Sequence, residues 1–228
     1  MNTLIVYAHR EPRSFNAMMK DVAVNYLSDH GHDVVVSDLH KMEFDPVAGR
    51  HDFLAAADPD YFDYQAEQRN AFKTSSMAPD LRAEHEKLLW CELLILQFPL
   101  WWYGVPAILK GWIDRVMSVG FAYDRGMKFN NGGLRGRTGM VSTSTAAEQS
   151  RYSPAEPLAY ASMEDTLRPL HRGLFRYVGI TPAEPFIGWA VNQMSEVERQ
   201  SCASAYRAHL RRVMQASRQK AAQEMVKP

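Results

Sequence analysis

The sequence lacks several features that would point to a particular compartment or ligand. It has only two cysteines in 228 residues, and Cys91 and Cys202 form neither a C-x-x-C pair nor a zinc-ligand spacing. No apolar stretch approaches the roughly 18 residues of a membrane span. The N-terminal segment lacks the basic region of a signal peptide. These absences predict a soluble cytoplasmic protein with reduced thiols in its helices, no metal site and no membrane insertion.

The sequence also lacks an excess of either charge. Lys and Arg together number 26, as do Asp and Glu, so the formal charge at pH 7 is +0. The one basic cluster, residues 207–218, falls on a predicted helix, where a solvated face is sufficient explanation. Neither nucleic acid nor an anionic membrane is therefore indicated as a partner.

Strand and helix signals alternate along the chain. Short apolar runs typical of buried strands occupy residues 4–7, 34–36, 93–96 and 140–143. Helical spacing of apolar residues marks 16–27, 80–91, 108–117, 163–177 (kinked or split at Pro169) and a last helix opened by Ser195 with Glu198. Two prolines interrupt a fifth strand region, 180–187. The series predicts one doubly wound α/β domain over residues 1–228, with a five-stranded parallel sheet and helices on both faces.

Three loops of this predicted fold would meet at the ligand-binding edge. In doubly wound sheets, ligands bind beyond the carboxyl ends of the strands, near the topological switch point. The loops in question are residues 9–15, 98–105 and 144–152. A fourth segment, 46–79, is a long irregular excursion, and excursions of this length are often functional.

The first loop, "AHREPRSFN", is neither a G-x-G-x-x-G nucleotide loop nor a P-loop. It places His9, Arg10, Arg13, Ser14 and Asn16 just before a predicted helix. Helix N-terminal N–H groups attract phosphate, and cationic and hydroxyl side chains strengthen that attraction. Simple capping of the helix by Ser14 is the alternative.

The second loop, "FPLWWYGV", carries an unusual number of aromatic residues. A planar, largely apolar heterocycle needs flat faces to pack against and a few backbone groups at its edge. Trp101, Trp102 and Tyr103 supply the faces, and Gly104 permits a close backbone approach. The alternatives are that these aromatics fill the core or make an oligomer contact.

The third loop, "STSTAAEQSRYSP", is rich in hydroxyl groups and small residues. Small side chains allow backbone N–H groups to face the edge of a ligand, and Tyr152 would add a phenol. A polar surface loop is the alternative. Because the three loops hold no obvious nucleophile, acid–base pair or metal site, a bound cofactor is expected to carry the chemistry.

Three motifs together resemble a known family. "LIVYAHREPRSFN", "LQFPLWWYGVPAILKGWIDRV" and "GFAY" are similar to the NAD(P)H:quinone oxidoreductases, the DT-diaphorase-like flavoproteins, in the same order from about Thr3 to Glu184. The resemblance implies a flavodoxin-like fold, a homodimer and a tightly held flavin, FAD or alternatively FMN. It also implies NAD(P)H as co-substrate and a small quinone-like acceptor reduced by hydride transfer, and it leaves NADH against NADPH open.

The resemblance assigns roles to residues of all three loops. The pyrophosphate and ribityl chain would lie against His9, Ser14, Phe15 and Asn16, and Arg13 and Met18 are counted with them as cofactor-binding. The isoalloxazine would lie against Pro99, Leu100, Trp101, Trp102 and Tyr103, and against Ser144, Thr145, Ala146 and Ala147. Asp114 and Arg199 would hold the adenosine end. Tyr152 matches the family's catalytic tyrosine, and Trp102 and a partner subunit's copy of Tyr123 would border the substrate.

The sequence departs from the family at three points. Ala146 and Ala147 replace a double glycine, Asp63 stands where relatives have an amide that touches the flavin, and no histidine follows Tyr152 before His171. Two other functions share the resemblance or the fold. One is a flavin-bearing ancillary subunit of a membrane transporter of the potassium-efflux type, and the other is a flavodoxin-like electron carrier.

Overall fold

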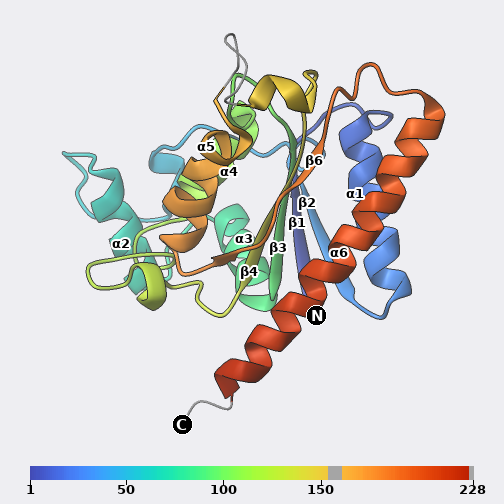
Figure 1. Ribbon diagram of the computed structural model, residues 1–228. Coiled ribbons are helices and arrows are strands. Elements are labelled where there is room, and N and C mark those ends of the chain that lie inside the picture. The colour runs from blue at the N-terminus through green and yellow to red at the C-terminus, as the bar shows by residue number, and fades with distance from the viewer. Residues whose placement is uncertain (154–160, 226–228) are drawn as a thin grey trace.

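Parallel strands form the centre of the molecule (Figure 1). The computed structural model describes residues 1–153 and 161–225. Its strands are β1 (Asn2–Tyr7), β2 (Asp33–Asp38), β3 (Leu93–Pro99), β4 (Thr138–Ser144), β5 (Thr181–Pro182) and β6 (Phe186–Gly188). Their order is β2-β1-β3-β4-β5, with β6 also paired to β4. This is the flavodoxin-like order, so the predicted fold class is confirmed.

The fifth position of the sheet is shared by two short strands. β5 pairs with the beginning of β4, where Thr138 lies opposite Thr181, and β6 pairs with its end, where Ser142 lies opposite Phe186. Pro182 at the end of β5 and Pro185 just before β6 cannot donate to a ladder, so the strand is broken there. The predicted interruption is confirmed.

Helices cover both faces of the sheet (Figure 1). One face carries α1 (Phe15–Asp29) and α6 (Glu196–Met225), and the other carries α3 (Pro79–Trp90), α4 (Ala107–Val116), α5 (Met163–Arg168) and the π-helix η4 (Pro169–Arg176). Side chains of β1 alternate between the two layers, with Leu4 and Val6 in one and Ile5 in the other. No helix within residues 1–153 and 161–225 combines the length and apolarity that crossing a membrane requires.

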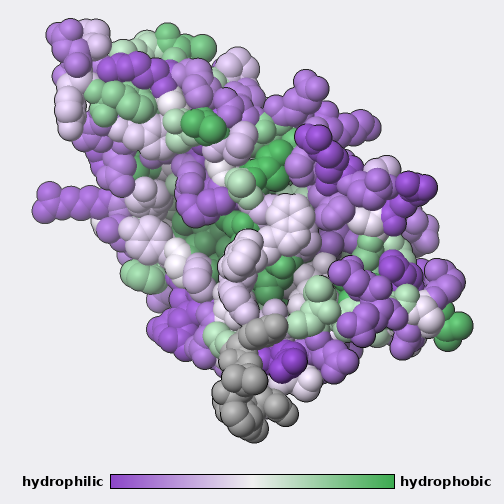
Figure 2. All heavy atoms as spheres, turned by 90° about the horizontal axis from the view of Figure 1, so that it is seen from above, coloured by the Kyte–Doolittle hydropathy of each residue, from purple (hydrophilic) through white to green (hydrophobic). Residues whose placement is uncertain are grey.

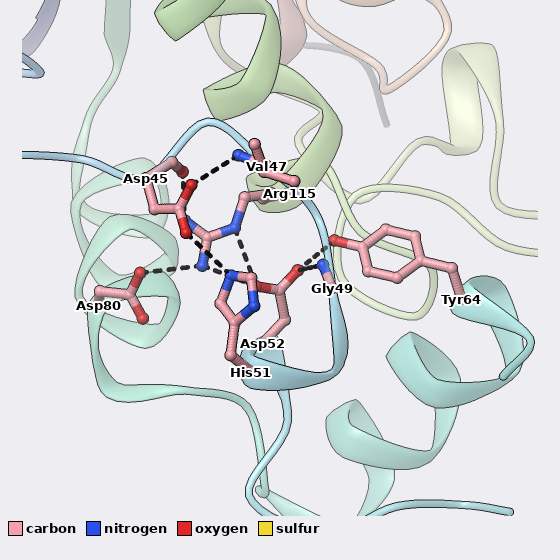
Figure 3. Close-up of polar contacts among 8 residues, drawn as sticks. All are labelled: Asp45, Val47, Gly49, His51, Asp52, Tyr64, Asp80 and Arg115. Carbon is pink, nitrogen blue, oxygen red and sulfur yellow. Dashed lines mark hydrogen bonds and ion pairs between the residues drawn. The ribbon is translucent and has the colours of Figure 1, made fainter.

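The long excursion after β2 is fixed to α4 by a buried ion pair (Figure 3). Arg115 and Asp52 are 1% and 0% exposed, and the guanidinium donates to Asp52 Oδ1 through Nε at 2.9 Å and Nη2 at 2.7 Å. Nη1 also donates to the carbonyl of Asp45 at 2.6 Å. One turn earlier in α4, a Cβ on Gly111 would lie 2.2 Å from Pro46 O, so the glycine permits this close approach. The excursion, which includes η1 (Arg50–Asp52) and α2 (Tyr64–Thr74), is therefore a packed part of the fold.

Cys91 is not inside a helix, contrary to the prediction. It is the C-capping residue that directly follows α3, and its thiol is buried, whereas Cys202 lies in α6 and is half-buried. Both thiols are free, and burial raises the pKa of each, that of Cys91 to about 11. Raised pKa values keep both groups protonated and unreactive near neutral pH.

His85 of α3 gives a prediction for stability against pH. Its ring stacks on Phe121 with centroids 3.7 Å apart, its Nε2 lies 2.8 Å from the carbonyl of Val116, and burial lowers its pKa to about 4. In the unfolded chain this imidazole takes up a proton near pH 6.5, whereas in the folded chain it stays neutral down to about pH 4. The free energy of unfolding therefore falls as the pH drops from 6.5 to 4. At pH 4 this loss is on the order of 3 kcal/mol. Chemical denaturation at a series of pH values from 4 to 7 measures this dependence. The free energy of unfolding should change less steeply with pH in His85→Gln than in wild type, and an equal slope would contradict the assignment to His85.

Candidate active site

The three loops singled out in the sequence lie together at the carboxyl edge of the sheet, at the top of Figure 1. They follow β1, β3 and β4, which are neighbours in the sheet. Figure 2 looks onto this edge and shows apolar surface exposed in a hollow, with hydrophilic side chains around it. The predicted meeting of the three loops at one edge is therefore what the structure shows.

The aromatic loop is a two-residue turn in an unfavourable backbone conformation. Trp102 and Tyr103 have φ of 49° and 59°, and the turn is closed by hydrogen bonds between Trp101 and Gly104, 3.1 Å and 2.9 Å long. Two successive positive φ values normally require Asn or Gly, and for bulky residues they are outliers that cluster at functional sites. Trp102 is 97% exposed, so the turn presents a flat ring outward. Core filling is therefore wrong as an explanation of this residue.

Further rings extend the aromatic turn across the edge. The ring centroid of Trp101 lies 6.4 Å from that of His9, and that of Tyr103 lies 6.5 Å from that of Tyr152. Tyr152 is in turn 5.3 Å from Trp189, which follows β6. Trp189 was not predicted, because the broken strand before it hid its position, although an aromatic residue directly after "FIG" was a usable signal. The edge thus carries aromatic side chains from four loops.

The first loop ends in a helix N-terminus suited to an anion. Ser14 Oγ accepts the N–H of Ala17 at 3.1 Å, which confirms the capping interpretation. The N–H groups of Phe15 and Asn16 have no acceptor among the described residues, and the first turn of α1 has no acidic residue. Such N–H groups attract phosphate.

Arg13 is partly neutralised within this loop. Its Nε lies 3.2 Å from Glu11 Oε1, and its backbone N–H donates to the same oxygen at 2.9 Å. These hydrogen bonds hold the pKa of Glu11 below its ordinary value. A phosphate at this helix end would therefore compete with Glu11 for Arg13.

A buried polar chain ties the first and third loops to β3. Gln97 Nε2 donates to Asn16 Oδ1 at 2.9 Å, and Asn16 Nδ2 donates to Ser144 Oγ at 2.8 Å. All three residues are buried. The side chain of Asn16, predicted to contact the cofactor, is thus occupied in fixing the geometry of the site. Gln97 was not predicted, and a polar residue inside an apolar strand was its only signal.

The third loop accommodates Ala146 and Ala147 where the resemblance implied a double glycine. Neither Ala146 nor Ala147 has a positive φ, so their Cβ atoms cause no backbone strain. Thr145 Oγ1 accepts the N–H of Ala147 at 3.0 Å and lies 3.3 Å from the Tyr152 hydroxyl. Ala146 is exposed, and its N–H has no acceptor within residues 1–153 and 161–225. That N–H is therefore available to the edge of a ligand.

The two residues predicted for the adenosine end do not come together. Asp114 is on α4, where Lys110 lies 2.6 Å from its carboxylate. Arg199 is on α6, across the sheet, with its guanidinium 6.0 Å from the ring centroid of Phe15. A cavity of about 380 Å³ between α1 and α6 is lined by Arg13, Ser14 and Met18, among others, but by neither Arg199 nor Asp114. Arg199 thus lies on a helix that borders this cavity, next to the lining residue Gln200, whereas Asp114 lies on α4 at the other face of the sheet.

The remaining predicted residues do not share one environment. Pro99 is buried at the end of β3. Leu100 and Tyr103 line an apolar cavity of about 540 Å³ between β3, α4 and η4. Tyr123 is half-buried against Tyr177, with ring centroids 5.4 Å apart, and Asp63 caps α2 by accepting two backbone N–H groups. Asp63 thus has a structural role that its sequence position did not suggest.

The part of the chain that the structure describes contains no cluster of side chains suited to a metal ion. Groups of three or more His, Cys, Asp or Glu side chains that could hold an ion do not occur there. The arrangement at the carboxyl edge instead combines flat rings, a helix N-terminus and backbone N–H groups, which are features that hold a planar ring bearing phosphate.

Comparison with known proteins gives consistent matches over nearly the whole chain. A family model described as the flavodoxin-like fold matches residues 1–211. Ribosyldihydronicotinamide dehydrogenase (quinone) from Pongo abelii is 39% identical over 211 residues, 92% of this chain and 90% of the relative. NAD(P)H dehydrogenase (quinone) 1 from Cavia porcellus is 40% identical over 189 residues, 82% and 68% of the two chains. The crystal structure of a putative quinone reductase from Klebsiella pneumoniae superposes with a TM-score of 0.85 at 32% identity, covering 92% and 83%.

Proposed function

Because the chain belongs to the flavodoxin-like family of quinone reductases, we propose that it is a flavin-dependent NAD(P)H:quinone oxidoreductase acting by two-electron transfer. One observation carries the proposal. Trp102, 97% exposed and held at positive φ, presents a flat ring at the carboxyl edge of the sheet. FAD is the flavin we propose, because the cavity between α1 and α6 offers room for an adenosine beyond the helix N-terminus.

The residues present fit a flavin. The aromatic turn would cover a face of the ring system, and the Ala146 N–H would meet its edge. The N-terminal N–H groups of α1 would hold phosphate, with His9, Arg13 and Ser14 beside it. A bound flavin would supply the redox chemistry, accepting a hydride from the nicotinamide and delivering two electrons to the acceptor.

The protein's own part is to position rings and stabilise charge. The apolar cavity beside Leu100 and Tyr103 would receive the acceptor and exclude water. Tyr152 is 8% exposed, and its hydroxyl lies 3.3 Å from Thr145 Oγ1. We propose that this phenol donates a hydrogen bond to negative charge that develops at the cofactor edge.

Replacing Tyr152 with phenylalanine tests that role. A hydrogen bond to a charged group contributes about 1.5–3 kcal/mol, so kcat/KM for a small quinone should fall about tenfold to a hundredfold while flavin affinity stays within about threefold. Tyr61→Phe, which alters a tyrosine 70% exposed on the excursion, is the matched control and should leave both values unchanged. Equal kinetics in Tyr152→Phe and wild type would show that the phenol has no part in turnover.

The proposed activity itself is tested by steady-state oxidation of NADH and NADPH with a small quinone. One hydroquinone should form for each nicotinamide oxidised, without oxygen consumption. Oxygen consumption at the same rate would indicate one-electron transfer and contradict the two-electron proposal. No observation in the described residues favours the transporter-subunit or electron-carrier alternatives.

We also propose that residues 1–228 act as one domain in a homodimer in the cytoplasm, with the partner subunit's Tyr123 completing the acceptor pocket. The family resemblance supports this arrangement. Light scattering of the purified protein should give twice the chain mass of 26.0 kDa, and a monomer with full activity would contradict it.

A further inference from the structure

A second groove adjoins the proposed flavin site on the outer side of the sheet. It has a volume of about 850 Å³ and runs between α5–η4 on one side and β5–β6 on the other. Trp189 lines it and also lies 5.3 Å from Tyr152. The groove is therefore continuous with the aromatic residues of the carboxyl edge.

Basic side chains line the far part of this groove. Arg168, Arg172 and Arg176 follow one another at intervals of four residues and are all exposed toward it. Arg168 pairs with Asp165. Arg172 and Arg176 have no carboxylate within 4.0 Å among the described residues. Their positive charge is therefore not neutralised within that part of the chain.

His171 supplies a further unpaired polar atom. Its Nε2 is buried and has no hydrogen-bond partner within residues 1–153 and 161–225, although the residue lines the groove. Burial and the nearby Arg176 lower the pKa of this imidazole, so it is neutral at pH 7. A neutral imidazole can donate one hydrogen bond to an anion without adding charge.

The helix that carries these residues is itself uncommon. η4 is a π-helix of eight residues beginning at Pro169, and π-helical turns occur frequently at functional sites. Its two sides serve two cavities. Leu170 and Leu174 line the apolar cavity beside Tyr103, whereas His171, Arg172 and Arg176 line the basic groove.

The charge distribution indicates where an anion would bind. Glu164 and Glu184 also line the groove, so the formal charge of its lining is +1. Glu164 precedes the arginine row in the sequence and Glu184 lies on the β5–β6 side, and neither carboxylate is within 4.0 Å of Arg172 or Arg176 in the described part of the chain. Another cavity near the aromatic turn, lined by Arg10, His40 and Lys41, also contains three acidic residues and has no positive excess.

We propose that this groove binds the phosphates of the nicotinamide dinucleotide, with Arg172 and Arg176 as the residues that make NADH and NADPH better donors than a phosphate-free dihydronicotinamide. The row of arginines spans roughly 10 Å along the helix, which suits an extended polyanion. Trp189 lines the groove and its ring also lies near Tyr152, and the linking part of the donor would pass over it. The inference rests on the proposed reductase function and adds the specificity for its donor.

The test compares donors with and without phosphate. In Arg172→Gln/Arg176→Gln, kcat/KM for NADH and NADPH should fall tenfold or more, mostly through KM, because two charge-assisted hydrogen bonds are lost. For dihydronicotinamide riboside the change should stay below twofold. Arg211→Gln/Arg218→Gln removes the same charge from exposed positions of α6 and should leave every donor unchanged.

A binding measurement guards against a general loss of activity in the variant. ADP-ribose should inhibit wild type competitively against NADH, and its inhibition constant should rise tenfold or more in the double variant. If kcat/KM fell equally for the riboside and the dinucleotides, or if the inhibition constant of ADP-ribose did not change, the assignment of the groove would be overturned. The reductase proposal would not be affected by either result. Absence of wild-type turnover with every donor would instead overturn the reductase proposal.

Discussion

Replacing Trp102 with alanine is expected to weaken flavin binding by about tenfold to a hundredfold without affecting the stability of the apoprotein. Stacking of a planar base on an aromatic side chain contributes about 1–3 kcal/mol. Trp102 is 97% exposed, so the substitution removes almost no buried apolar surface. The free energy of unfolding should therefore change by less than about 0.5 kcal/mol. Titration with FAD and with FMN, followed by fluorescence, measures the affinity.

Trp90→Ala is the matched control for this experiment. Trp90 ends α3 at the amino edge of the sheet, where its carbonyl accepts a hydrogen bond from Asn2, and it is 36% exposed. Its replacement should leave flavin affinity unchanged. If Trp102→Ala binds flavin like wild type, the aromatic turn has another purpose, and an oligomer contact would then be the remaining interpretation.

Replacing Arg115 with methionine is expected to destabilise the protein by about 3–5 kcal/mol, because Asp52 is left as a buried carboxylate without its cation. The same change frees the Asp45 carbonyl and loosens the excursion from α4. Thermal unfolding should shift downward by roughly 10 °C. Differential scanning calorimetry of wild type and variant gives this shift directly.

Burial, and not the mere presence of an ion pair, is the cause of that expected loss. Arg69 and Asp124 form a comparable two-bonded pair, 41% and 30% exposed at their side chains. Arg69→Met should therefore cost less than about 1 kcal/mol. The double variant Arg115→Met/Asp52→Asn should be more stable than Arg115→Met alone. Similar losses in Arg115→Met and Arg69→Met would contradict the account.

The fold could be predicted from the sequence wherever burial leaves a periodic signal. The apolar runs at β1 and β3 and the β-branched run at β2 define a parallel sheet, and Ser195 with Glu198 does form the predicted cap, with Glu198 accepting the Ser195 N–H at 2.7 Å. The excursion was not predicted in detail. Its anchor is Arg115, and an arginine in the last turn of a helix normally indicates solvent. Only tertiary structure brings Asp52 to it.

The site could be predicted in composition but not in conformation. The residues of "PLWWYG" indicated a pocket for a flat ring, yet bulky residues at positive φ contradict every local rule, so the outward turn at Trp102 had no sequence signal. The basic row of Arg168, Arg172 and Arg176 was not predicted, although its spacing of four was a usable signal. A helix that changes to π geometry at Pro169 could not be predicted from that spacing, because η4 packs against β5 and such tertiary contacts leave no local sequence pattern.

The central claim, that the carboxyl edge holds a redox-active flavin, is tested most directly by the visible absorbance spectrum of the purified protein supplied with FAD. The account predicts a bound flavin whose absorbance bleaches on anaerobic addition of NADH or NADPH and returns when a quinone is added. A protein that stays colourless after incubation with FAD and with FMN, and whose melting temperature neither flavin raises, would contradict it.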